Sequence, residues 1–207
     1  PAVCDEIAGR GELISCYDQG AYSDHGKNQI FFEAQTMICM LLGMEFTAQT
    51  CHDGAQAAAT AVSMANRITG RKKILLPANM NPQILSTVKN YCYSVQEEQR
   101  LDLVMVNYDS KTGMVDLEDL KSKLDDTVAG VYLENPNYLG QLEADAPQIG
   151  QLAKAAGAEF IVNANPLSLG VIEAPANYGA TIAICDLHDL GCHLSSGGSQ
   201  SGIIATP

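Results

Sequence analysis

The chain has 207 residues, 46% of them hydrophobic and 17% charged, a composition typical of one globular domain with a sizeable buried core. Its net charge of −12 disfavours nucleic-acid binding through phosphates and docking on anionic membrane surfaces. No apolar run reaches the ~18 residues that a membrane-spanning helix needs, and no signal-peptide pattern opens the chain. Seven cysteines without the spacing of a disulfide framework predict reduced thiols and a cytoplasmic location.

The first fifty residues differ in pattern from the rest of the chain. Residues 31–44 predict one long apolar-rich helix that ends at Gly43. This helix is too hydrophobic to lie alone at a surface. We therefore expect residues 1–50 to form a helical segment that packs on the core or on another subunit.

From residue 51 to residue 207, helical and extended patterns alternate. Helices are expected after the N-cap Asp53, from Pro82, after the N-cap Asp116 and from Ala146. Short apolar strands are expected at 73–76, 101–106, 127–133, 159–162, 180–184 and 202–205. Because their apolar residues run continuously, both faces of the sheet should be buried. The sequence predicts an α/β domain with three αβα layers around a mostly parallel sheet.

Polar residues follow four of these strands, at 79–81, 135–138, 163–166 and 186–188. In open parallel sheets, ligands bind outside the carboxyl ends of the strands. These segments therefore predict a polar crevice, although Asn and Asp are also common in turns for conformational reasons alone. The helix start at Gly54 is a weaker signal for an anion, because free N–H groups and the helix dipole meet there.

Four side chains with reactive groups, Cys185, His188, Cys192 and His193, lie close together near the end of the chain. One interpretation is a zinc site, but structural zinc ligands usually come as two separate pairs, and Cys185 falls inside an expected strand. Another is a Cys/His nucleophile pair, although neighbours in sequence need not have the geometry that such a pair requires. The simplest interpretation is a strand, a turn and a Gly-rich loop.

Short motifs along the whole chain resemble one known family. They lie at residues 32–39, 42–44, 53–55, 69–73, 165–170 and 178–180. On these residues the chain resembles subunit 1 of glycine dehydrogenase (decarboxylating), the alpha half of the split P-protein of the glycine cleavage system. The resemblance implies the large domain of the type I pyridoxal-phosphate-dependent transferase fold. The family's C-terminal small domain would be absent, and the abrupt ends at Pro1 and Pro207 favour a domain taken from a longer protein.

The resemblance also implies that the cofactor site has degenerated. Catalytic members of this fold carry a Schiff-base lysine at a position that falls at Leu190, and residues 180–200 contain no lysine, so no imine can form. Asn165 falls where catalytic members place an Asp against the pyridinium nitrogen, and Asn81 where a ring-stacking residue is common. No catalytic residue, metal or cofactor is expected in this chain. The expected remnant is a vestigial crevice with the candidate residues Asp53, Gly54, Asn81, Asn165 and His188.

The implied function is that of a non-catalytic alpha partner in a heteromer. The beta subunit would bind pyridoxal phosphate and decarboxylate glycine, and the aminomethyl group would pass to the lipoyl arm of H-protein. Residues 17–26 and 185–193 match the family only loosely, which leaves open a divergent homologue with other partners. One alternative is a stand-alone binding or regulatory module that holds a small anion or nucleotide in the vacated crevice. Another is a metal-dependent enzyme that uses the Cys/His cluster.

Overall fold

The computed structural model describes residues 1–11, 25–48, 51–93, 99–194, 198 and 201–207. The helices are α1 (Ala2–Ala8), α2 (His25–Leu42), α3 (Gly54–Thr69), α4 (Pro82–Cys92), α5 (Leu117–Lys123) and α6 (Ala146–Ala155). The strands are β1 (Phe46–Thr47), β2 (Lys73–Pro77), β3 (Asp102–Val106), β4 (Val128–Asn135), β5 (Glu159–Ala164), β6 (Ile182–Asp186) and β7 (Gly202–Thr206). Short 3-10 turns η3 (Ser168–Gly170) and η4 (Pro175–Tyr178) lie between β5 and β6, and η5 (His188–Leu190) follows β6.

All seven described strands form one sheet in the order β1-β7-β6-β5-β4-β2-β3. The pairs from β3 through β2, β4 and β5 to β6 are parallel, whereas β7 runs antiparallel to both β6 and β1. The predicted mostly parallel sheet is confirmed. The antiparallel end adds a two-residue strand, β1, that the local sequence pattern does not predict.

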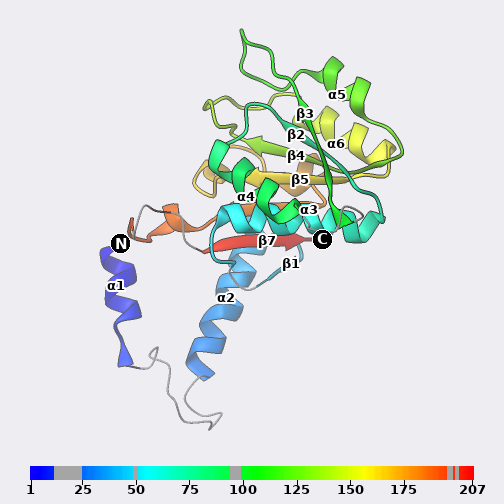
Figure 1. The fold of residues 1–207 in the computed structure, drawn as a ribbon. Helices are drawn as coiled ribbons and strands as arrows, with labels where there is room; N and C mark the ends of the chain where they lie inside the picture. Colours follow the sequence, from blue (N-terminus) through cyan, green and yellow to red (C-terminus); the bar gives the residue numbers. More distant parts are fainter. Residues whose placement is uncertain (12–24, 49–50, 94–98, 195–197, 199–200) are drawn as a thin grey trace.

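Helices cover both faces of the sheet, as the continuous apolar strands predict (Figure 1). In β2, Ile74 and Leu76 pack with α3 and α4, while Leu75 between them packs on the opposite face with residues of α5 and α6. Most of the buried face of α3 is alanine, and its small side chains let the helix lie close to the sheet. The three-layer αβα architecture is therefore confirmed.

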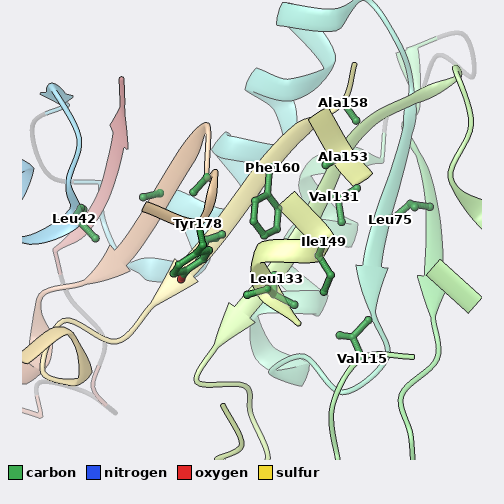
Figure 2. Close-up of a cluster of buried hydrophobic side chains, with 14 of the residues drawn as sticks. Leu42, Leu75, Val115, Val131, Leu133, Ile149, Ala153, Ala158, Phe160 and Tyr178 are labelled. Carbon is green, nitrogen blue, oxygen red and sulfur yellow. The ribbon is translucent and has the colours of Figure 1, made fainter. Parts of the chain in front are cut away.

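The core between α6 and the sheet is built around one aromatic pair (Figure 2). Phe160 of β5 and Tyr178 of η4 meet edge to face, with their ring centroids 6.4 Å apart. Gly150 of α6 lies against this pair, and a Cβ there would come within 2.5 Å of the Tyr178 carbonyl oxygen. The lack of a side chain at Gly150 thus sets how closely α6 approaches the loop before β6.

The helix boundaries follow the expected capping chemistry. The Asp53 side chain accepts a 2.6 Å hydrogen bond from the Gln56 amide at the start of α3, and Asp116 caps α5 in the same way. Gly43 and Gly70 follow the ends of α2 and α3 with φ of +71° and +70°. These left-handed conformations cost glycine little, which is why both helices end where the sequence predicts.

Helix α2 contacts the domain mainly through its C-terminal half. Ile38 and Leu42, near the end of α2, are buried in the core, and Gln35 donates a hydrogen bond to the Thr47 carbonyl of β1. The beginning of α2 projects away from the sheet (Figure 1). Phe32 and Met40 on this helix are 64% and 77% exposed. The loosely matching segment 17–26 falls largely outside the described residues. Among the helices the structure describes, none is long and apolar enough to cross a lipid bilayer.

Arg71, in one of the family-like motifs, is structural. It lies just before β2, away from the carboxyl ends of the parallel strands. Its guanidinium donates hydrogen bonds of 2.8–3.0 Å to the carbonyl oxygens of Val128, Ala156 and Gly157. A single side chain thus joins the start of β4 to the end of α6.

We expect Arg71→Met to lower the free energy of unfolding by about 2–3 kcal/mol, because carbonyls that accept from a charged donor lose their partner. Urea denaturation measures the change. Arg67→Met is the control, since Arg67 lies exposed in the last turn of the neighbouring helix α3. Equal effects of the two substitutions would show that the three carbonyl contacts contribute nothing.

Candidate functional site

Two adjoining cavities lie where the parallel strands end. One of about 220 Å³ and one of about 410 Å³ share Asn81, Ile84, Asn163, Asp186 and Asp189 in their walls, and together they form one crevice. The larger cavity also contacts Asp53, Gly54, Ala55, Gln83, Thr87 and His188. The smaller one also contacts Glu134, Pro136, Asn137, Tyr138, Ala164, Asn165 and Pro166. The segments after β2, β4, β5 and β6 therefore converge on one crevice, as the topology predicts.

The five candidate residues all line the crevice, but they are divided between its two cavities. Asp53, Gly54, Asn81 and His188 line the larger cavity, and Asn81 and Asn165 line the smaller one. Leu190, the position counted as that of the Schiff-base lysine, is not part of either wall and is 45% exposed. From η5, the residues that reach the crevice are His188 and Asp189.

The start of α3 is occupied by the protein's own carboxylates. The Gly54 amide donates a 2.8 Å hydrogen bond to Asp186 Oδ2, and the Gln56 amide donates to Asp53. Asp186 Oδ1 in turn accepts from the His188 amide at 2.8 Å, which holds the carboxylate in place. The anion expected at this helix start is therefore supplied from within the chain, by a residue 132 positions away from Gly54.

A buried carboxylate lies in the wall of the smaller cavity. Glu134, at the end of β4, is 4% exposed and accepts hydrogen bonds from the Asn81 amide at 3.0 Å and the Tyr132 hydroxyl at 3.2 Å. Burial raises the pKa of the Glu134 carboxyl, and hydrogen bonds from Asn81, Tyr132 and Asn163 oppose part of that rise. Burial and the negative charge of Glu134 likewise raise the pKa of Tyr132.

Asn165 belongs to a turn that closes one side of the crevice. Its side-chain amide donates to Asp189 at 2.7 Å, and its side-chain oxygen accepts from the Leu167 amide. Asn163, inside β5, lines both cavities, and Asp186 lies in the wall that the cavities share. Both belong to the polar segments 163–166 and 186–188 that predicted the crevice, although neither was singled out as a candidate residue. Glu134 lies just outside the predicted segments, although it too is a polar residue at the end of an apolar strand.

The raised pKa of Glu134 predicts a specific pH dependence. In the folded state this carboxyl holds its proton to higher pH than in the unfolded state, where the ordinary value is 4.5. Stability from this group is therefore greatest below that value and is lost as the pH rises through the folded-state pKa. Glu134→Gln removes the titration, so the variant should gain stability relative to the parent as the pH increases.

Urea midpoints measured between about pH 4 and pH 8 test this expectation. Glu118→Gln provides the control, because that carboxylate is exposed on α5 and its removal should leave the slope nearly unchanged. Parallel profiles for the parent and Glu134→Gln would contradict the assignment.

The Cys/His cluster does not converge in space. Cys185 is fully buried in β6, where burial raises its pKa to about 12, and the His193 ring lies 2.8 Å from the Asp5 carboxylate of α1. Among the residues the structure describes, no group of three or more His, Cys, Asp or Glu side chains could hold a metal ion. The geometry therefore favours the simplest interpretation, a strand followed by a turn.

The sheet order, the three layers and the crevice at the strand ends define the large domain of the pyridoxal-phosphate-dependent transferase fold. A sphingosine-1-phosphate lyase from Burkholderia pseudomallei shares it with a TM-score of 0.66 at 18% identity, over 87% of this chain and 45% of that one. The family model described as glycine cleavage system P-protein matches residues 1–207. The chain belongs to the glycine cleavage system P-protein family.

Individual relatives agree with this assignment. Proteins named "Probable glycine dehydrogenase (decarboxylating) subunit 1" from Staphylothermus marinus and Carboxydothermus hydrogenoformans are 38% and 39% identical over 100% and 99% of this chain. The crystal structure of an inhibitor-bound glycine decarboxylase (P-protein) superposes with a TM-score of 0.87 at 35% identity, over all of this chain and 45% of that chain. This chain spans 44% and 45% of the length of the two curated relatives.

The residues of the crevice do not fit pyridoxal phosphate. The last lysine of the sequence is Lys154, before β5, and the residues described in the cavity walls include no lysine or arginine. The walls instead carry four carboxylates, from Asp53, Glu134, Asp186 and Asp189. A phosphate ester would lack a cationic partner here, and a cofactor aldehyde would lack an amine within the crevice.

Proposed function

We propose that this chain is the large domain of subunit 1 of a two-subunit glycine dehydrogenase (decarboxylating). The observation that carries the proposal is the match of essentially the whole chain, at 37–39% identity, to proteins of that name. The chain acts with a second subunit, because a subunit 1 is one part of a larger enzyme.

Within that enzyme this chain is the non-catalytic partner and holds no cofactor of its own. Support comes from the crevice, whose described walls lack an amine for an imine and a cation for a phosphate. Subunit 2 binds pyridoxal phosphate and decarboxylates glycine, and the aminomethyl group passes to the lipoyl arm of H-protein. The cytoplasm is the proposed compartment, which the free state of the described cysteines supports.

An exposed apolar surface supports the assembly. A groove of about 410 Å³ separates α2 from β1, and we call it the α2–β1 groove; its lining is Phe32, Gln35, Thr36, Cys39, Met40, Gly43, Met44, Glu45, Phe46 and Thr47. Phe32, Met40 and Phe46 are each more than 60% exposed. Large apolar side chains gathered on one surface are typical of protein–protein contacts, and we assign this surface to subunit 2.

Co-purification of the full-length protein with subunit 2 tests the proposal. Labelled bicarbonate should exchange into glycine only when both subunits, pyridoxal phosphate and H-protein are present. Borohydride reduction of the active complex should label a lysine of subunit 2. Exchange by this chain alone, or a reduced cofactor adduct on one of its own lysines, would contradict the non-catalytic role.

The alternative is a stand-alone module that binds a small ligand in the crevice. The two adjoining cavities favour it, but their acidic walls favour a neutral or cationic ligand over the anion or nucleotide expected from the sequence. A pull-down in which subunit 2 fails to associate would support this alternative.

A further inference from the structure

The N-terminus of α3 has the properties of an anion site, yet a side chain of the same chain fills it. α3 is 16 residues long and begins at Gly54, so the N–H groups of its first turn lack partners within the helix, and its dipole favours negative charge there. Asp186 supplies that charge through the 2.8 Å hydrogen bond from the Gly54 amide. The carboxylate occupies the position where an anionic group of a ligand would bind.

The fit between Gly54 and Asp186 is close from both sides. A Cβ at position 54 would lie 3.0 Å from the Asp186 Cβ and 3.1 Å from its Oδ2. The other carboxylate oxygen is held by the His188 amide, so the side chain is fixed at both oxygens. The Asp186 carboxylate is therefore fixed at the start of α3 by two backbone hydrogen bonds, in the wall shared by the two cavities.

The other carboxylates in the crevice also disfavour an anionic ligand. Asp53 and Asp189 line the larger cavity beside Asp186, and Glu134 lines the smaller one. Each repels an entering phosphate, and within the described walls no basic side chain offsets them. Asp186 differs from the other three in one respect, because it also takes up the Gly54 N–H donor that a phosphate would need.

We propose that Asp186 is a built-in anion that closes this crevice to phosphate esters, pyridoxal phosphate included. This inference rests on the proposed function, because it explains how a domain of this fold remains free of the cofactor within an assembly whose other subunit uses it. Removing the carboxylate should expose the Gly54 and His188 N–H groups and turn the start of α3 into a phosphate site.

Binding of inorganic phosphate and of pyridoxal phosphate to the full-length protein tests the inference. Calorimetry should detect no saturable binding of phosphate at millimolar concentration to the parent. Asp186→Ala should bind both compounds at least about tenfold more tightly, since one repulsive charge is lost and two N–H donors are freed. Asp189→Asn is the matched control, because it removes the same charge from the same crevice without freeing the helix start.

Two results would overturn the inference. One is a parent protein that binds either compound as tightly as Asp186→Ala does, and the other is an equal gain in Asp186→Ala and Asp189→Asn. If circular dichroism shows that Asp186→Ala does not fold, Asp186→Asn takes its place. Its single amide oxygen can accept from only one of the Gly54 and His188 N–H groups, so this variant should still gain more affinity than Asp189→Asn. Failure of the proposed function looks different, since it appears as loss of association with subunit 2 while phosphate binding stays absent.

Discussion

Gly202→Ala should prevent this chain from folding, with a loss of more than about 4 kcal/mol, a range reached only by severe structural conflicts. A Cβ at position 202 would overlap the carbonyl oxygen of Asp53 and crowd the Gly54 nitrogen. Neither side can withdraw, because Gly202 and Cys51 exchange backbone hydrogen bonds of 2.6 and 3.0 Å. The first residue of β7 thus passes directly against the start of α3.

Far-UV circular dichroism and thermal unfolding of the purified variant measure this effect. Gly170→Ala is the control, because a Cβ at that exposed glycine would meet nothing within 4 Å. A Gly202→Ala protein that melts near the parent temperature would show that the contact between β7 and α3 can relax.

Glutamate substitutions that place negative charge in the α2–β1 groove should weaken association of the two subunits. We expect Phe32→Glu combined with Met40→Glu in the full-length protein to weaken binding of subunit 2 at least about thirtyfold, because large apolar contacts at interface centres often contribute 2 kcal/mol or more each. Exchange activity at subunit concentrations near the parent dissociation constant should fall in parallel. Both side chains are mostly exposed, so the free protein should keep its melting temperature.

A matched pair of substitutions controls for the added charge. Ile68→Glu with Val171→Glu also changes two exposed apolar residues, at 59% and 93% exposure, but neither of them lines the groove. This pair should leave association unchanged. If the groove variant unfolds more easily while still binding subunit 2, the groove is covered by the protein's own chain, and the assignment is wrong.

Local sequence was sufficient for most elements because their determinants are local. Asp53 and Asp116 cap helices through contacts within three residues, and Gly43 and Gly70 end helices through their own backbone conformation. β1 was not predictable in this way. It has two residues, and what makes it a strand is its pairing with residues 205–206 far along the chain.

In the crevice, too, some features could be predicted from the sequence and others depend on contacts between distant residues. The topological rule placed it correctly, because the carboxyl ends of parallel strands must meet at one edge. The rule does not tell which side chain is fixed by which partner. Asp186 and Gly54 are distant in sequence, so the bond that fills the helix start was not predictable, and the local sequence offered only a weak signal for an anion there.

The pairing of β1 with β7 also determines when the domain can be completed during synthesis. Thr47 and Ile204, joined by a side-chain to backbone hydrogen bond, are 157 positions apart. Strands β2 to β6 can associate as they leave the ribosome, whereas β1 and the helix α2 that leads into it must wait for residues 202–206. Until residues 202–206 have been made, the apolar residues of α2 therefore lack the strand β7 on which this end of the sheet depends. We expect this early-made, late-docking helix to be the part of the nascent chain that depends most on chaperones.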